Sequence, residues 1–238
     1  PAPTPTPEPP PPAGTVETAL LPGTPYETAA TIRHSGQRGP VLMVLGGVHG
    51  NEPGGWMAAE EVAGWAPAAG SLIVVPRCNR LAIPLFARTT GELGDLNRLY
   101  PGDDASPLPM ARMAASIVAL AREQRVTALL DLHESWAFYA ERTQNGTAFL
   151  GQTVTAGDGP LTPALGQRIV ERVNGEIGAG RDLLIFRDRL PAEGQGAAGA
   201  QGRSRSSLGI GNAVPGLTPI RAEMAQQDQP IPRRVQLQ

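Results

Sequence analysis

Short apolar runs that alternate with helix-length segments are the feature that most constrains the fold of this chain. Three of the runs span residues 39–47, 71–79 and 126–134, with the sequences GPVLMVLGG, SLIVVPRCN and VTALLDLHE. Continuous apolar runs of this length are typical of strands buried on both faces of a sheet. Strands separated by helices favour a parallel sheet, whose carboxyl edge is where open α/β folds place ligand sites.

The segments that separate and follow these runs have helical periodicity or a further strand pattern. Helices are predicted over 52–66, 109–124 and 161–177, and a last strand over 217–225. The segment 194–216 is rich in Gly, Ala and Ser and is predicted to be a long mobile loop. Together these elements predict a single α/β domain, in which a mixed, mostly parallel β-sheet carries helices on both faces.

The amino-terminal residues 1–14, PAPTPTPEPPPPAG, have a composition that cannot form a packed core. Such a tract is typical of an extended, polyproline-like spacer, so we predict a disordered linker over 1–14 and the folded domain over 15–238. Spacers of this kind are common in exported bacterial proteins, and the sequence begins at Pro1 without a methionine. Export to the periplasm or the extracellular space and a cytoplasmic location therefore both remain open.

Charge and residue usage exclude several classes of protein. The formal net charge of −2 and the pI of about 6.0 provide no basic field that could attract nucleic acid. The sequence has no run of 18 apolar residues, so it predicts no transmembrane segment. All 20 basic residues are arginine, which excludes lysine Schiff-base chemistry. The single cysteine, Cys78, is predicted to be a buried small residue at a strand end. The sequence does not determine the oligomeric state.

Two of the three histidines follow apolar runs, and each has a carboxylate nearby. Glu52 lies three residues after His49, and Asp131 lies two residues before His133. An imidazole and a carboxylate from one turn, with a second histidine from another strand end, would supply three ligands and leave a position open, as in catalytic zinc sites. Singly, either histidine more often has a structural role. His34, in the polar RHSGQRG, is predicted to be exposed and unrelated.

Further polar residues lie between the two histidines and near the carboxyl end. The segment FARTTGELGDLNRLYPG (86–102) is too polar for a core helix, and it contains Arg88 and the pair Asn97 and Arg98. Arginine is the natural bidentate partner of a carboxylate, although a solvated loop with a helix cap is an equally good interpretation. Glu223 ends an apolar run, where it is either a surface charge or a general base.

The sequence contains, in this order, the motifs GGVHGNE, RTTGELGDLNR and LLDLHE and then a strand that ends in glutamate. In their order and approximate spacing, these motifs resemble the zinc carboxypeptidase superfamily. The succinylglutamate desuccinylase/aspartoacylase branch is the most similar one. The resemblance covers about residues 40–225. It implies a zinc-carboxypeptidase-like fold, one Zn²⁺ ion, and a zinc hydrolase catalytic domain over 15–238.

The resemblance also implies roles for individual residues. His49, Glu52 and His133 match the zinc ligands. Arg88 matches the arginine that polarises the scissile carbonyl, Asn97 and Arg98 match the pair that holds a substrate carboxylate, and Glu223 matches the general base and acid. We interpret Asp95 and Asp131 as supporting residues beside the ligands.

The implied function is hydrolysis of an amide bond next to a carboxylate, in a small N-acyl amino acid or in a peptide. Two alternatives remain: an exported carboxypeptidase or amidase that acts on cell-wall peptides, and a non-catalytic carboxylate-binding module of the same fold. Retention of every implied ligand argues against the binding module. A serine or cysteine hydrolase is disfavoured because the sequence has no GxSxG motif.

Overall fold

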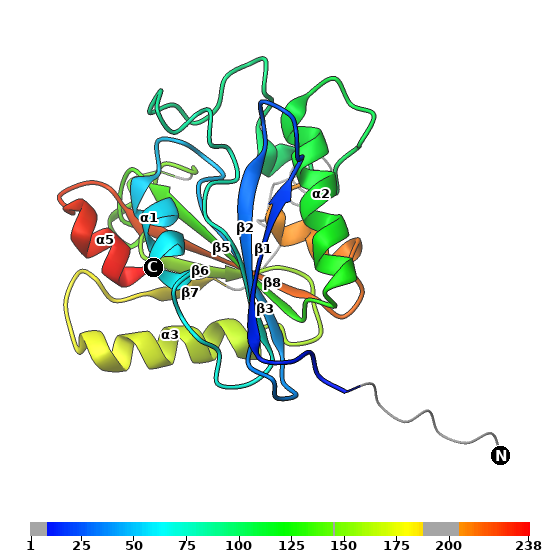
Figure 1. Cartoon of the computed structure of the whole chain (residues 1–238). Helices are drawn as coiled ribbons and strands as arrows, with labels where there is room; N and C mark the ends of the chain where they lie inside the picture. Colours follow the sequence, from blue (N-terminus) through cyan, green and yellow to red (C-terminus); the bar gives the residue numbers. More distant parts are fainter. Residues whose placement is uncertain (1–8, 145, 188–204) are drawn as a thin grey trace.

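The computed structural model describes residues 9–144, 146–187 and 205–238, which form one mixed β-sheet between two layers of helices (Figure 1). The strands are β1 (Gly14–Leu20), β2 (Thr28–His34), β3 (Val41–Leu45), β4 (Ser71–Val75), β5 (Ala128–Ser135), β6 (Thr153–Ala156), β7 (Ile185–Arg187) and β8 (Thr218–Ala225). Their order across the sheet is β1-β2-β4-β3-β5-β8-β6-β7.

Parallel strands form the centre of the sheet. Strands β4, β3, β5 and β8 run parallel to one another, and β6 runs parallel to β7. The pairs β1–β2, β2–β4 and β6–β8 are antiparallel. The predicted mixed, mostly parallel sheet is therefore confirmed, and the three predicted central strands are adjacent in it.

The helices lie on both faces, as predicted (Figure 1). They are α1 (Pro53–Val62), α2 (Pro109–Glu123), α3 (Ala164–Ile177) and α5 (Ile231–Leu237), with short 3₁₀ segments η1 (Leu96–Arg98), η2 (Tyr139–Glu141) and η3 (Ser207–Asn212). Helices α1 and α2 both have a proline in the first turn, where the missing N–H costs no hydrogen bond. Helices α1, α3 and α5 cover one face, and α2 lies against the other.

The alternation of side chains along a strand decides what each face presents. In β5, Leu129 joins the core on the α2 face, whereas Leu132 packs with α1 on the opposite face. Because successive side chains point to opposite faces, Asp131 and His133 share the α2 face with Leu129. In the sequence DLHE, Asp131 and His133 therefore lie on one face of the sheet and Leu132 lies on the other.

Four strands were not predicted from the sequence: β1, β2, β6 and β7. All four lie outside the parallel core of the sheet, and their sequences mix polar and apolar residues without a continuous apolar run. The predicted linker falls partly on residues 1–8, which lie outside the described residues, and its boundary stays a prediction. Of the predicted loop 194–216, residues 194–204 also lie outside them, but 207–212 form η3, which is largely buried. No helix among the described residues has the length and apolar character that crossing a bilayer requires.

Candidate metal centre

Three of the predicted site residues meet at the carboxyl edge of the sheet. His49 follows β3, Glu52 directly precedes α1, and His133 lies in β5, which pairs in parallel with β3. All three side chains are buried, and their ligand atoms lie within 4.8 Å of one another. Residues 84 positions apart in the sequence (133 − 49) are thus brought together by strand pairing.

The nitrogen atoms that face one another in this cluster are the two Nδ1 atoms. Nδ1 of His49 is 2.6 Å from Oε1 of Glu52, and Nδ1 of His133 is 2.9 Å from Oε2. The two Nδ1 atoms are 3.2 Å apart. Ligands about 2.0–2.2 Å from a tetrahedral ion are separated by roughly 3.3 Å, which the separation of the two Nδ1 atoms matches, while the carboxylate oxygens lie closer to the nitrogens at hydrogen-bond distance.

The other ring nitrogens face carboxylates. Nε2 of His133 is 2.7 Å from Oδ2 of Asp131, and Nε2 of His49 is 3.4 Å from Oδ1 of Asp95. Metal-binding histidines commonly have such a carboxylate on the second nitrogen, which fixes the ring and makes it more basic. Both residues interpreted as supporting therefore lie where that role requires.

Charge neutralisation holds the buried cluster together. Burial by itself would raise the pKa of Glu52, but the charges and hydrogen bonds of His49 and His133 hold that pKa well below its usual value. Burial by itself would lower the pKa of His133, but the charges of Asp131 and Glu52, and hydrogen bonds to both, raise it to about 10. A cation that replaces this proton meets the same carboxylates, so the pocket is suited to positive charge.

Arg88 lies beside the cluster and remains accessible to solvent. Its Nε and Nη2 atoms are 3.1 Å and 3.0 Å from Oδ2 of Asp95, while Nη1 is 3.9 Å from Oε1 of Glu52. The side chain is 42% exposed. The guanidinium is therefore anchored on one side and open on the other, where a substrate oxygen near the cluster can reach it.

Asn97 and Arg98 occupy η1 but differ in environment. Asn97 is buried, and its Oδ1 accepts a hydrogen bond of 3.2 Å from the backbone N–H of Ser207. That bond fixes the amide so that its NH₂ group is the part available to a carboxylate. Arg98 is exposed, and its Nη1 donates to the carbonyl oxygen of Asn97 at 2.7 Å. The short segment that carries the pair begins at Asp95, whose Oδ1 accepts from the backbone N–H of Asn97 and lies 3.4 Å from Nε2 of His49.

Glu223 lies next to the cluster through strand pairing. It is the direct partner of His133 in the parallel pairing of β5 with β8. Glu223 is buried, which raises the pKa of its carboxyl, and the charges of Arg221 and His133 oppose that rise. A carboxyl whose pKa is raised is suited to exchanging a proton with substrate or water.

Arg221 was missed in the sequence interpretation. Its Nε is 3.2 Å from Oε1 of Glu223, and the side chain is only 14% exposed. The alternation IRAEM in β8 was the available signal, because it places Arg221 and Glu223 on one face and Ile220, Ala222 and Met224 on the other.

A second buried ion pair supports the site from the opposite face of the sheet. Nη1 of Arg234, in α5, lies 2.8 Å from both carboxylate oxygens of Glu134, the residue after His133. The backbone N–H of Glu134 donates to Oε2 of Glu52 at 3.0 Å, and Gln238 donates to the carbonyl oxygen of His133 at 2.6 Å. Nothing in the local sequence identifies this contact, because its partners are 100 residues apart.

The two remaining residues singled out from the sequence lie apart from the cluster. His34 is half-buried rather than exposed, in β2, with Nδ1 2.8 Å from Oγ of Ser71. Its prediction as an exposed residue was wrong because β2 pairs with β4 and brings Ser71 against it. Cys78 is buried, as expected.

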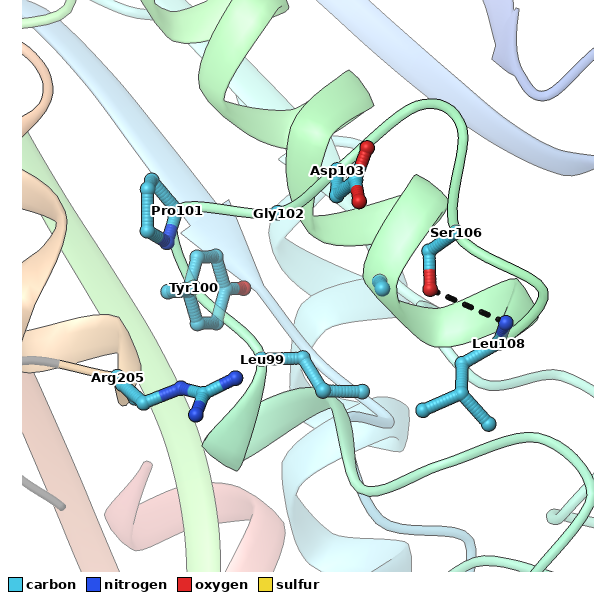
Figure 2. A pocket seen from close by; sticks show the side chains of 9 residues that line it. Leu99, Tyr100, Pro101, Gly102, Asp103, Ser106, Leu108 and Arg205 are labelled. Atoms are coloured by element: carbon cyan, nitrogen blue, oxygen red, sulfur yellow. Dashed lines mark hydrogen bonds between the residues drawn. The ribbon is translucent and has the colours of Figure 1, made fainter.

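An open hollow of about 600 Å³ lies beyond η1 and does not include the cluster. Figure 2 shows its lining, in which Tyr100 and Leu99 lie between Arg205 and the start of α2, and Ser106 bonds to the backbone of Leu108. The hollow is therefore separate from the cluster, since neither His49, Glu52 nor His133 lines it.

Comparison with known proteins agrees with this geometry. The family described as succinylglutamate desuccinylase/aspartoacylase catalytic domain matches residues 38–138, which include both histidines and Glu52 but not Glu223. No curated protein matches the chain. The match covers less than half of the chain, and over that segment the chain is homologous to hydrolases.

Solved structures match over more of the chain at low sequence identity. Product-bound Csd4, a cell shape determinant protein of Helicobacter pylori, has a TM-score of 0.69 at 18% identity, over 94% of this chain and 52% of Csd4. The mDAP-bound form of Csd4, described as a D,L-carboxypeptidase, has a TM-score of 0.67 at 19% identity, over 83% and 48%. An aspartoacylase family protein from Mesorhizobium loti has a TM-score of 0.53 at 20% identity, over 90% and 62%.

The chain thus spans about half the length of the Csd4 structures that it matches. At this level of identity the likeness to solved structures establishes the fold alone. The chain therefore has a zinc-carboxypeptidase-like α/β fold, and its segment 38–138 is homologous to the catalytic domain of succinylglutamate desuccinylases and aspartoacylases.

Proposed function

We propose that this protein is a zinc-dependent amide hydrolase that cleaves an N-acyl amino acid or a peptide next to a carboxylate. The observation that carries the proposal is the convergence of His49, Glu52 and His133, with Glu223 directly opposite His133. Three protein ligands with an adjoining buried carboxyl are the layout of catalytic rather than structural zinc sites, which close all four positions with protein ligands.

His49 and His133 would hold the ion through Nδ1, and Glu52 through its carboxylate. A zinc ion bound there supplies Lewis-acid polarisation of a carbonyl and lowers the pKa of water to about 7. Asp131 and Asp95 keep the imidazoles oriented through Nε2. Proton transfer and substrate positioning then depend on the residues around these ligands.

Glu223 moves the proton in the proposed reaction. Its carboxylate accepts a proton from the attacking water, and its carboxyl later returns that proton to the leaving amine. Arg88 donates hydrogen bonds to the oxygen on which charge develops, because its free side faces the cluster. Asn97 and Arg98 orient the substrate by its carboxylate, the first through its amide NH₂ and the second through its guanidinium.

A peptidase acting on cell-wall peptides is the second candidate within this proposal. The observation that favours it is the structural match, since Csd4 aligns with a TM-score of 0.69 and the aspartoacylase family protein with 0.53. Csd4 has been solved with a tripeptide and with mDAP. Peptides that end in meso-diaminopimelate therefore belong in a substrate panel beside N-acyl amino acids.

The experiment loads the purified chain with zinc, measures metal by elemental analysis, and assays Glu223→Gln against that panel. We expect one zinc per chain and a fall in kcat of about 10²-fold or more, since a positioned acid–base group contributes about 10²–10⁴-fold. Glu176→Gln, an exposed position on α3, is the matched control. Substoichiometric zinc, or unchanged hydrolysis in Glu223→Gln, would refute the mechanism. Ligand binding without hydrolysis by the wild type would identify a carboxylate-binding module instead.

A further inference from the structure

The carboxylate of Glu134 lies directly behind the turn 49–54, which carries two of the three residues of the metal centre. Glu134 belongs to β5, on the face of the sheet opposite His133, and its side chain is fully buried. Three groups donate to this carboxylate: Nη1 of Arg234 at 2.8 Å, Nε2 of Gln226 at 3.2 Å, and the backbone N–H of Gly54. One buried side chain therefore connects β5, the start of α1 and the segment that follows β8.

The turn before α1 is held at three points by Glu134 and Gln226. The backbone N–H of Glu134 donates to Oε2 of Glu52 at 3.0 Å, and the carboxylate accepts from the N–H of Gly54. Nε2 of Gln226 donates at 2.8 Å to the carbonyl oxygen of Asn51. The carboxylate of Glu52 and the backbone on both sides of it are therefore tied to the same small group of residues.

Close packing couples this group to the ligand. A Cβ atom at Gly54 would overlap Oε1 of Glu134, and one at Gly55 would overlap the carbonyl oxygen of Leu132, so the first turn of α1 lies directly on β5. A carboxylate is also favoured at the amino end of a helix, where the free N–H groups carry partial positive charge. A displacement of Glu134 would therefore displace the start of α1, and Glu52 with it.

Stability alone does not account for an ion pair buried at this place. Taking the charges of Glu134 and Arg234 out of water is costly, and replacing such a pair with apolar residues of similar volume is often neutral or stabilising. Apolar side chains could fill the same space, but they could not accept a hydrogen bond from Gly54 or Gln226. Hydrogen bonds to charged groups are short and directional, so the pair is better suited to fixing positions than to adding stability.

We propose that Glu134 is a positioning residue for the metal ligand Glu52, that Arg234 and Gln226 hold it in place, and that these contacts set the affinity of the centre for zinc. The inference rests on the metal centre of the proposed function. Because the carboxylate of Glu134 is directed to Arg234 and the start of α1, it acts through Glu52 and does not itself bind the ion.

The first test removes hydrogen bonds without creating an unpaired buried charge. Gln226→Met loses both side-chain hydrogen bonds and leaves the ion pair intact. We expect zinc affinity, measured by competition with a chromophoric chelator, to fall about 10- to 100-fold, the usual effect of losing a partner beside a metal ligand. Gln229→Met is the matched control because Gln229 lies in the same segment but donates to Asp182. It should keep the wild-type affinity and the same unfolding midpoint as Gln226→Met.

The second test removes the whole ion pair in the double variant Glu134→Met, Arg234→Met. No charge is then left unpaired, so its urea midpoint should lie closer to that of the wild type than the midpoint of Arg234→Met does. Zinc affinity should nevertheless fall at least about 10-fold. The visible spectrum of the cobalt(II)-loaded protein depends on coordination geometry and should change in the double variant but not in Gln229→Met.

Two results would overturn the positioning role. One is wild-type zinc affinity together with a wild-type cobalt spectrum in both Gln226→Met and the double variant. The other is an affinity that falls only in proportion to stability across all the variants, because the contacts would then be structural. Lower affinity in Gln226→Met, at the same unfolding midpoint as Gln229→Met, supports the proposal.

Hydrogen exchange and hydrolysis make the two proposals separable. In the metal-free protein the backbone N–H of Glu134 should exchange faster in Gln226→Met than in Gln229→Met, since it donates to Glu52, and equal rates would overturn the positioning role. If the wild type binds zinc but hydrolyses no substrate, the hydrolase proposal fails, and the affinity and exchange results still decide the role of Glu134. Hydrolysis by the wild type with unchanged affinity in the variants would refute the positioning role alone.

Discussion

His133 and Glu223 are direct partners in the parallel pairing of β5 with β8, so a predicted metal ligand and a predicted general base share one face of the sheet. The two residues are 90 positions apart in the sequence (223 − 133). Strand pairing fixes the distance between them without any loop, and a site built on strands keeps its geometry better than one built on loops.

Removal of one ligand should abolish stoichiometric zinc binding. In His133→Gln the cluster keeps only two ligands at the ion, and two protein ligands do not hold zinc against buffer. We expect less than 0.1 zinc per chain, as an approximate threshold, after loading and desalting, measured by elemental analysis. His34→Gln changes a histidine of β2 outside the cluster and should keep the wild-type stoichiometry. Equal zinc content in the two variants would contradict the ligand set.

The metal-free protein should lose stability as the pH rises from about 6.5 to about 10. The pKa of His133 is raised from 6.5 to about 10 by its carboxylate partners, so the stabilising charge is fully present below 6.5 and is lost as the pH rises through the folded-state value. Urea unfolding across this pH range measures the effect. Zinc displaces the proton and should flatten the profile. A metal-free profile without any decline would exclude the imidazolium form.

Asp131→Asn should weaken zinc binding more than it weakens folding. The carboxylate is 2.7 Å from Nε2 of His133 and fixes the ring with Nδ1 toward Glu52. Loss of such a partner typically costs about 10- to 100-fold in metal affinity. Competition with a chromophoric chelator gives the affinity. Thermal unfolding of the metal-free variant is the control, and a large loss of stability with unchanged affinity would contradict the orienting role.

Arg234→Met should destabilise the protein strongly because it leaves Glu134 buried without its cation. Removing one partner of a buried pair costs about 3–5 kcal/mol in the free energy of unfolding. The loss should be largest at neutral pH and smaller in acid, where Glu134 is protonated. Arg172→Met, in the exposed pair with Glu176, should change stability by less than about 0.5 kcal/mol. Equal denaturant midpoints would refute a structural role for α5.

Gly54→Ala should destabilise α1 although alanine is the better helix former. A Cβ atom at Gly54 would overlap Oε1 of Glu134 and press against Arg234, so the ion pair below the helix would have to shift. Gly175→Ala in α3 meets nothing within 4 Å and should raise stability by about 0.5–1 kcal/mol. Thermal unfolding of the two variants should therefore change in opposite directions.

The glycines of GGVHGNEPGG illustrate a limit of sequence interpretation. Several of them border His49 and Glu52, and the sequence alone suggests that they let the chain approach an ion closely. In the structure, Cβ atoms at Gly50 and Gly55 would overlap the backbone at Ala82 and Leu132. These glycines therefore allow close packing of the turn and of α1 on neighbouring segments, a reason that no local pattern reveals.

The sequence by itself determined the central strands, the main helices and the predicted ligand set, because long apolar runs and short motifs are local signals. The tertiary structure alone decided the edge strands, the pairing of Glu134 with Arg234, and the place of Arg221 beside Glu223. Those features depend on strand order and register, which bring together residues up to 100 positions apart and are set by packing of the whole sheet. The local sequence supplies the reactive side chains, and strand pairing sets the distances between them.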